Sequence, residues 1–136
     1  MTTMDVYLTR AAQTHFRALA SFSSYPDGFL IGHKRGQRYF VESVFSVPIR
    51  VASAQAKHIT LDQLLDERIL GFFTFLPNNI KRERLFRPLF MGKVLLEVQA
   101  SSGKDPDMKA YSIDYADRFF LSPLKIKRES TRQGNA

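Results

Sequence analysis

The stretch from residue 69 to residue 77 constrains this chain more than any other. It reads ILGFFTFLP, an apolar run that is too short and too rich in phenylalanine for a helix and that ends at a proline. Such a run is typical of a strand buried on both faces. Its last side chains, Thr74, Phe75 and Leu76, are then delivered to the rim of a sheet. None of the three can hold a metal ion, and Thr74 without a partner is at best a weak acid, base or nucleophile.

Composition narrows the function classes further. The chain has 136 residues, about one domain, and it contains no cysteine. Disulfides and cysteine-based zinc sites are therefore excluded, and three scattered histidines leave little material for another metal site. The first residues lack the features of a signal peptide, and no apolar run approaches about 18 residues. We therefore expect a soluble, cytoplasmic protein that has no cofactor and does not contact a membrane.

The chain is strongly basic. Its 20 Lys and Arg residues outnumber its 13 Asp and Glu residues and give a formal net charge of +7. This charge favours anionic partners in general. It does not identify nucleic acid as the partner, because many small basic domains bind none.

Hydrophobic periodicity predicts the elements of the fold. A helix is expected over residues 10–22, with His15 on its apolar face as a core residue rather than a ligand and Gln13 on its polar face. Strands are expected over residues 5–8, 28–34, 37–48, 69–76, 93–99 and 108–114, and short helices over 61–67 and 80–86. Residues 50–58 read as a loop, and residues 119–127 as an extended or helical segment.

The order of these elements indicates one domain. A strand, a helix, a hairpin, a helix, the buried strand, a short helix and a second hairpin follow each other with no repeat and no linker. This order favours an α/β domain built around a mixed sheet. We expect the single domain to cover residues 5–127. The polar residues 128–136 have nothing to bury and are expected to form a disordered tail.

Three apolar segments follow one another in a recognisable order. They are GFLIGH at residues 28–33, YFVESVFSVP at 39–48 and ILGFFTFLP, and the segments at 93–99 and 109–111 continue the series. Their order and spacing resemble the JAB/MPN (Mov34/PAD-1-like) domain family over roughly residues 5–115. The resemblance implies a cytidine-deaminase-like architecture, in which a mixed, curved sheet is flanked by helices.

Active members of this family are zinc peptidases that cleave bonds next to ubiquitin-like proteins. Carried over to this chain, the resemblance places the two zinc-binding histidines at Thr74 and Leu76, the serine and aspartate of the motif at Arg84 and Arg87, and the general base at Tyr25. A catalytic zinc needs about three protein ligands and an open position for water. The resemblance therefore implies a degenerate member that binds no zinc and is not an enzyme.

A basic cluster follows the buried strand. Its members are Lys81, Arg82, Arg84, Arg87 and Lys93, and Glu83 is the only acidic residue among them. One interpretation is that these residues form the solvent-exposed face of a helix and have no binding function. The alternative interpretation is an anion-binding site, for a phosphate or a partner's carboxylate, where backbone N–H groups at a helix N-terminus meet arginine side chains.

Two functions of different class follow. The favoured one is a catalytically inactive module, a scaffold or regulatory pseudoenzyme, that binds a protein partner or a second copy of itself through apolar segments such as residues 51–56 and 119–124. The alternative is binding of an anion, a nucleotide phosphate or a nucleic acid through the basic cluster. The chain has no tryptophan, no glycine-rich phosphate loop and no recognisable reading helix, so the alternative is not favoured.

Overall fold

Seven strands, two helices and a 3₁₀ turn make up the part of the chain that the structure describes. This computed structural model describes residues 4–21, 26–47, 68–75, 77–99 and 106–130. The strands are β1 (Asp5–Leu8), β2 (Asp27–Arg35), β3 (Arg38–Ser46), β4 (Ile69–Thr74), β5 (Val94–Gln99), β6 (Asp107–Tyr115) and β7 (Phe119–Arg128). The helices are α1 (Arg10–Ala20) and α4 (Asn79–Arg84), and η1 (Pro88–Phe90) is the 3₁₀ turn.

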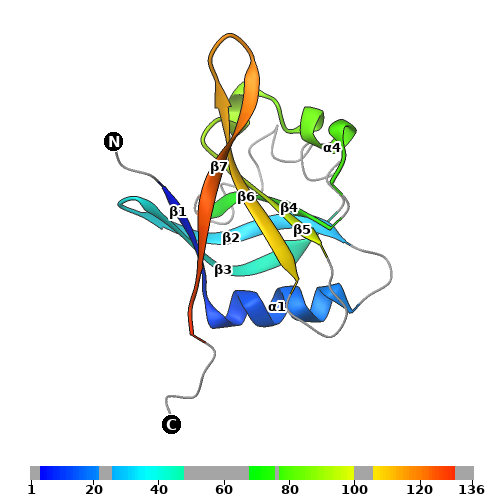
Figure 1. The fold of residues 1–136 in the computed structure, drawn as a ribbon, viewed down its shortest axis with the longest axis vertical. Helices are drawn as coiled ribbons and strands as arrows, with labels where there is room; N and C mark the ends of the chain where they lie inside the picture. The colour runs from blue at the N-terminus through cyan, green and yellow to red at the C-terminus, as the bar shows by residue number, and fades with distance from the viewer. Residues whose placement is uncertain (1–3, 22–25, 48–67, 76, 100–105, 131–136) are drawn as a thin grey trace.

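The strands close into a barrel in the order β1-β3-β2-β4-β5-β6-β7, and β7 pairs again with β1 (Figure 1). The expected α/β class, with a mixed, curved sheet flanked by helices, is therefore wrong. The sheet is mixed, because β1 runs parallel to both of its neighbours and β4 runs parallel to β5, whereas the other pairs are antiparallel.

Closure of the barrel depends on the shortest strand. In β1, Leu8 lies opposite Val41 of β3 on one side and opposite Arg128 of β7 on the other. Val6 and Leu8 are fully buried. Four residues thus pair with two strands that would otherwise be sheet edges. The local pattern predicts a strand here but does not specify its partners, so the sequence predicts a mixed sheet flanked by helices and not the closed barrel.

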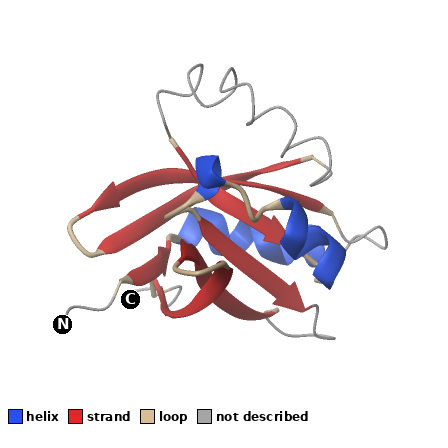
Figure 2. Cartoon of the chain, turned by 90° about the horizontal axis from the view of Figure 1, so that it is seen from above, coloured by secondary structure: helices blue, strands red, loops and turns tan. Residues whose placement is uncertain are grey.

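The barrel interior holds one of two hydrophobic cores. Strand residues that point inward include Leu30, Val41, Phe73, Leu96 and Ala110. Helix α1 lies across the lower end of the barrel, as Figures 1 and 2 show from the side and from above. Its Phe16 inserts into this core, and the Phe16 ring packs edge-on against Phe73 with centroids 5.4 Å apart.

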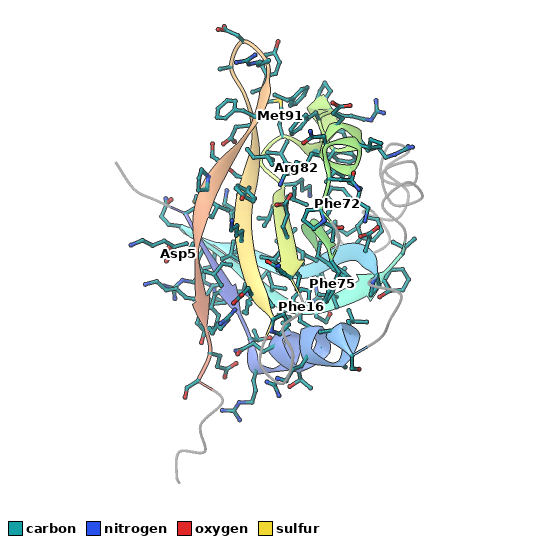
Figure 3. All side chains as sticks on the ribbon, turned by 45° about the vertical axis from the view of Figure 1, so that its right-hand side comes forward. Asp5, Phe16, Phe72, Phe75, Arg82 and Met91 are labelled. Atoms are coloured by element: carbon teal, nitrogen blue, oxygen red, sulfur yellow. The ribbon has the colours of Figure 1, made fainter. Side chains whose placement is uncertain are left out.

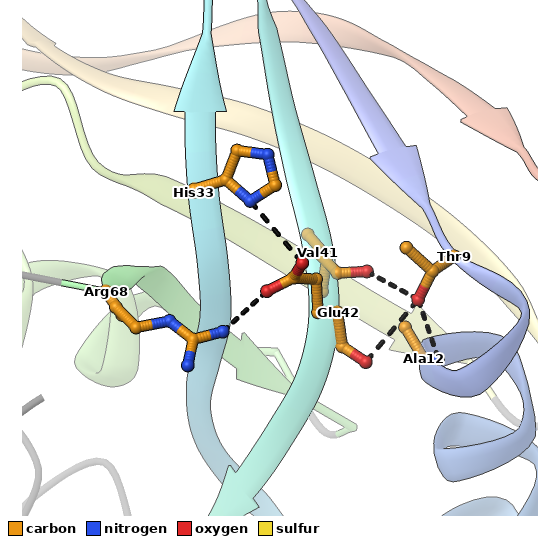
Figure 4. Close-up of polar contacts among 6 residues, drawn as sticks. All are labelled: Thr9, Ala12, His33, Val41, Glu42 and Arg68. Atoms are coloured by element: carbon orange, nitrogen blue, oxygen red, sulfur yellow. Dashed lines mark hydrogen bonds and ion pairs between the residues drawn. The ribbon is translucent and has the colours of Figure 1, made fainter.

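Thr9 fixes the helix to the barrel wall (Figure 4). Its hydroxyl accepts a hydrogen bond from the backbone N–H of Ala12 at 3.2 Å, as an N-cap does, and donates to the carbonyl of Val41 at 3.0 Å. Two residues of α1 differ from the expected pattern. Gln13 is buried because its amide donates to the carbonyls of Leu8 and Glu129, and His15 is exposed.

The second core lies outside the barrel wall. It joins the outward side chains of β2, β4, β5 and β6 to Leu85, which follows α4, and to Phe90 of η1. It consists of Phe29, Ile69, Phe72, Leu85, Phe90, Leu95 and Ile113. We call this side of the barrel the covered face. Because β4 has a core on each side, all six of its residues are buried, as its apolar sequence predicts.

The pairing of β4 with β5 needs a glycine. A Cβ atom at Gly71 would lie 1.9 Å from the carbonyl oxygen of Val94, so any larger residue would push the two strands apart.

Among the described residues, neither helix is long and apolar enough to cross a membrane.

Several expectations fall on other parts of the chain. The loop at 50–58, the helix at 61–67 and the apolar segment at 51–56 lie outside the described residues. The sequence predicts a disordered tail from residue 128, but Arg128 ends β7, and the N–H of Glu129 donates to the carbonyl of Leu8. Residues 131–136 are outside the described part.

Candidate functional site

The carboxyl end of β4 brings three polar side chains together. The hydroxyl of Thr74, which is buried, donates to Oδ1 of Asp27 at 2.5 Å. The Nζ of Lys81 lies 3.0 Å from the same carboxylate oxygen and 3.1 Å from the Thr74 hydroxyl. Lys81 reaches this position because Asn78 caps α4 by accepting from the Lys81 N–H, which sets the first turn of the helix beside the strand end.

A second ion pair attaches α4 to β5. Arg82 donates from Nε and Nη2 to the two carboxylate oxygens of Glu97, both at 2.7 Å. The carboxylate is 6% exposed, whereas the Arg82 side chain is 34% exposed. The hydrogen bond to Glu97 is the main reason why the pKa of Arg82 lies above its usual value. This two-point contact fixes the orientation of the guanidinium group.

A cavity of about 860 Å³ opens beside this pair, where β4 and β5 end and β6 begins. Its apolar lining includes Phe75, Val98 and Met108, and its charged lining includes Glu97 and Lys109. Figure 3 shows Phe75 beside Phe16 at the lower end of the barrel and Arg82 higher up. The cavity has the size of a small-molecule site. It contains no nucleophile paired with a base among the described residues that line it.

The structure separates the basic cluster that the sequence places at one site. Lys81 and Arg82 bind Asp27 and Glu97, and Lys93 donates to the carbonyl of Ile69 at 2.7 Å. Arg87 donates to the carbonyl of Arg84 at 3.3 Å. The helix whose N-terminus is expected to bind the anion, α4, has only six residues. Three of the five cations therefore contact other groups of the chain, and anion binding by the cluster stays a prediction.

The positions carried over from the JAB/MPN resemblance are only partly described. Thr74 lies in the buried contact with Asp27 and Lys81, and Arg84 and Arg87 lie at the end of α4 and just beyond it. Tyr25 and Leu76 lie outside the described residues. Among the described residues, no group of three or more His, Asp or Glu side chains is arranged to hold a metal ion.

Sequence reasoning missed Asp27 and Glu97. Glu97 left a signal, because it is a single carboxylate within the apolar run VLLEVQ, and a charge in a buried strand needs a partner. The sequence contains no such signal for Asp27, since this residue follows Pro26 at the end of an expected loop. A third carboxylate, Glu42, binds Arg68 at 2.5 Å and lies 3.5 Å from Nδ1 of His33 (Figure 4).

Comparisons with known proteins identify a fold but no family. No protein-family model matches the chain, and no curated protein matches it. Among solved structures, the chain is similar to the solution structure of protein DSY2949 from Desulfitobacterium hafniense. The TM-score is 0.60 at 16% identity, over 96% of this chain and 97% of that one. At this identity the likeness shows a shared fold and nothing about function.

Proposed function

We propose that this chain is a catalytically inactive binding module that acts through contact with a protein partner. One observation carries the proposal, an apolar surface at the end of the barrel opposite α1. We call it the tip surface. It consists of Phe86, Leu89 and Met91 beside α4 and η1, and of Tyr115 and Phe119 at the tip of the β6–β7 hairpin.

The tip surface is continuous with the second core. The rings of Phe86 and Phe119 are stacked 5.8 Å apart, and the ring of Tyr115 packs edge-on against Phe119 at 5.0 Å. Leu89 and Met91 flank the buried Phe90, yet they are 42% and 51% exposed, and Tyr115 is 53% exposed. Large apolar side chains gathered at one place in this way are typical of protein contact surfaces.

The charges at the edge of the tip surface favour a partner with acidic residues. Arg87 follows Phe86, and Arg118 precedes Phe119, and both arginines are exposed. Asp117, next to Arg118, is exposed as well, so these three residues together carry one net positive charge. Pairing of two tip surfaces in a homodimer would bring these arginines near their own copies, which costs Coulomb energy. We therefore favour a different protein as the partner and keep a second copy of the chain as the alternative. We further propose that the module acts in the cytoplasm.

Photocrosslinking in cells tests the contact. A photoreactive amino acid replaces Met91 in the tip surface or, as the control, the exposed Ala18 on α1. We expect discrete adducts from position 91 that are lost when Leu89→Lys is added, and none from position 18. The adduct mass distinguishes a second copy from another protein. No adduct at position 91, or the same adducts at both positions, would reject the tip surface as the contact.

On the basis of its motif order we also propose that the chain is inactive at the positions where JAB/MPN domains bind zinc, although its closed barrel differs from the architecture that the resemblance implies. The first zinc-ligand position is Thr74, whose hydroxyl contacts the ammonium group of Lys81. The carboxylate of Asp27 beside it is already paired with Lys81, so this position does not offer the about three protein ligands that a catalytic zinc needs. We expect purified protein to contain no stoichiometric zinc by elemental analysis. One zinc per chain that survives dialysis against a weak chelator would contradict both the placement of Thr74 and the absence of catalysis.

A further inference from the structure

The side of the barrel formed by β2, β3, β1 and β7 carries aromatic and basic side chains in two rows. In the first row, His33 lies opposite Phe40, Phe40 opposite Tyr7, and Tyr7 opposite Lys127. In the second row, Arg35 lies opposite Arg38, Arg38 opposite Asp5, and Asp5 opposite Lys125. We call these eight residues the aromatic–basic face. Figure 3 shows Asp5 on the other side of the barrel from Phe72 and Arg82.

The rings of the first row form a continuous series. His33 stacks on Phe40 with centroids 5.1 Å apart and ring planes inclined by 14°. Phe40 contacts Tyr7 at 5.3 Å with an inclination of 59°. All three side chains are only partly buried. The second row supplies guanidinium groups, since Arg38 lies 5.4 Å from the Tyr7 ring and Arg35 lies 5.9 Å from the Phe40 ring.

Positive charge dominates this face. Asp5 is the only carboxylate among the eight residues, and it is 18% exposed and shared between Arg38 at 3.3 Å and Lys127 at 3.9 Å. Glu42 lies beside the face, 3.5 Å from Nδ1 of His33, and is itself paired with Arg68. Arg35, Lys125 and Lys127 are exposed. A shallow hollow of about 290 Å³ lies over the second row, beside Arg35, Arg38 and Phe40. One carboxylate cannot neutralise four cations, so the face attracts anions.

We propose that the aromatic–basic face binds single-stranded nucleic acid. Partly exposed rings on neighbouring strands offer surfaces on which unpaired bases stack, and four-stranded sheet faces of this kind hold two or three bases. The cations beside the rings contact the phosphates. A duplex hides the flat faces of its bases, and a second copy of this face would be repelled by like charge. The combination of rings and cations therefore fits a single strand better than it fits a duplex or a second copy of the chain.

Fluorescence anisotropy with labelled oligo-dT and oligo-U tests the proposal. If Arg35, Arg38, Lys125 and Lys127 contact about four phosphates, raising the salt from about 50 to about 200 mM should weaken binding about fiftyfold. Lys125→Gln with Lys127→Gln should weaken binding at low salt and reduce the salt slope by about half. Tyr7→Ala should weaken binding about fivefold or more, whereas Tyr7→Phe should retain it.

A matched control separates this face from the other cations of the chain. Arg84→Gln with Arg87→Gln removes the same charge from α4 and its flank, and we expect less than a twofold change in affinity. The proposal is overturned if this control weakens binding as much as the lysine pair does, or if Tyr7→Ala has no effect. It is also overturned if a duplex binds more tightly than the single strand, or if no binding is detected at about 100 µM protein in low salt.

Discussion

The two outer sides of the barrel are built from the same kind of strand but are completed differently. On the covered face, outward residues such as Phe72 and Leu95 are buried in the second core, together with Leu85 and Phe90 from the segment that contains α4 and η1. On the aromatic–basic face, outward residues such as Tyr7 and Phe40 contact each other and stay partly exposed. The covered face adds a core and therefore stability, whereas the other face leaves rings and cations accessible for binding. The two sides therefore differ in the exposure of their aromatic rings and in the cations that accompany the rings of the aromatic–basic face.

Replacing one aromatic residue on each side gives the largest expected contrast. Phe72 is 1% exposed and packs against Phe29 at 5.6 Å and Phe90 at 5.0 Å, so Phe72→Ala should lower the free energy of unfolding by about 3–5 kcal/mol. Phe40→Ala removes cross-strand contacts at a partly exposed position and should cost about 1 kcal/mol. Urea unfolding followed by circular dichroism measures both. Equal losses would mean that both sides are structural cores.

The attachment of α4 to the covered face gives the next largest effect. Arg82→Ala leaves the buried carboxylate of Glu97 without its partner and should cost about 2 kcal/mol, less than a fully buried pair because Arg82 is 34% exposed. The matched control is Arg84→Ala on the same helix, which should change stability by less than about 0.5 kcal/mol. If both variants lose the same stability in urea unfolding, the Arg82–Glu97 contact does not fix the helix.

Tyr39 links the barrel interior to the segment that follows η1. Its hydroxyl donates to the carbonyl of Gly92 at 2.9 Å, so Tyr39→Phe should cost about 1 kcal/mol at neutral pH. Burial, with a smaller contribution from Asp114, raises the pKa of Tyr39 above its usual value of 10.0. The folded state therefore keeps the phenolic proton after the unfolded state has lost it, and stability falls as the pH rises above about 10.

The variant without the hydroxyl lacks this part of the pH dependence. The difference in unfolding free energy between the natural protein and Tyr39→Phe should therefore shrink as the pH rises above about 10. Urea unfolding at a series of pH values from about 8 to about 11 measures it. A difference that stays constant over this range would show that Tyr39 titrates normally.

Most elements could be predicted from the sequence, but their assembly could not. β1, α1 and β4 lie close to their expected positions, because a capped amphipathic pattern and a continuous apolar run are local signals. The pairing of β1 with both β3 and β7 is a long-range choice that periodicity does not record. A register shift next to Gly32 also breaks the alternation of β3, which leaves Phe45 54% exposed, although its spacing groups it with Tyr39 and Val41.

The candidate sites show the same limit. The sequence reveals Lys81, Arg82 and Lys93 as a basic cluster, because they are close along the chain. It does not reveal that Asp27, Glu97 and the carbonyl of Ile69 bind them. Conversely, Tyr7, Phe40 and Lys127 are far apart in sequence and become neighbours only through the strand register. Both the pairing of the basic cluster and the assembly of the aromatic–basic face thus depend on contacts between residues that are distant in sequence.

The smallest expected effect tests whether the aromatic–basic face is dispensable for folding. Lys125 and Lys127 are exposed, and the only ion pair of Lys127 that the described residues show is the 3.9 Å contact with Asp5. Exposed pairs of this kind contribute little, so Lys125→Gln with Lys127→Gln should change the free energy of unfolding by less than about 0.5 kcal/mol. Urea unfolding of the double variant measures this. A loss above about 1 kcal/mol would place these lysines in the structural framework, and any loss of oligonucleotide binding could then not be assigned to direct contact.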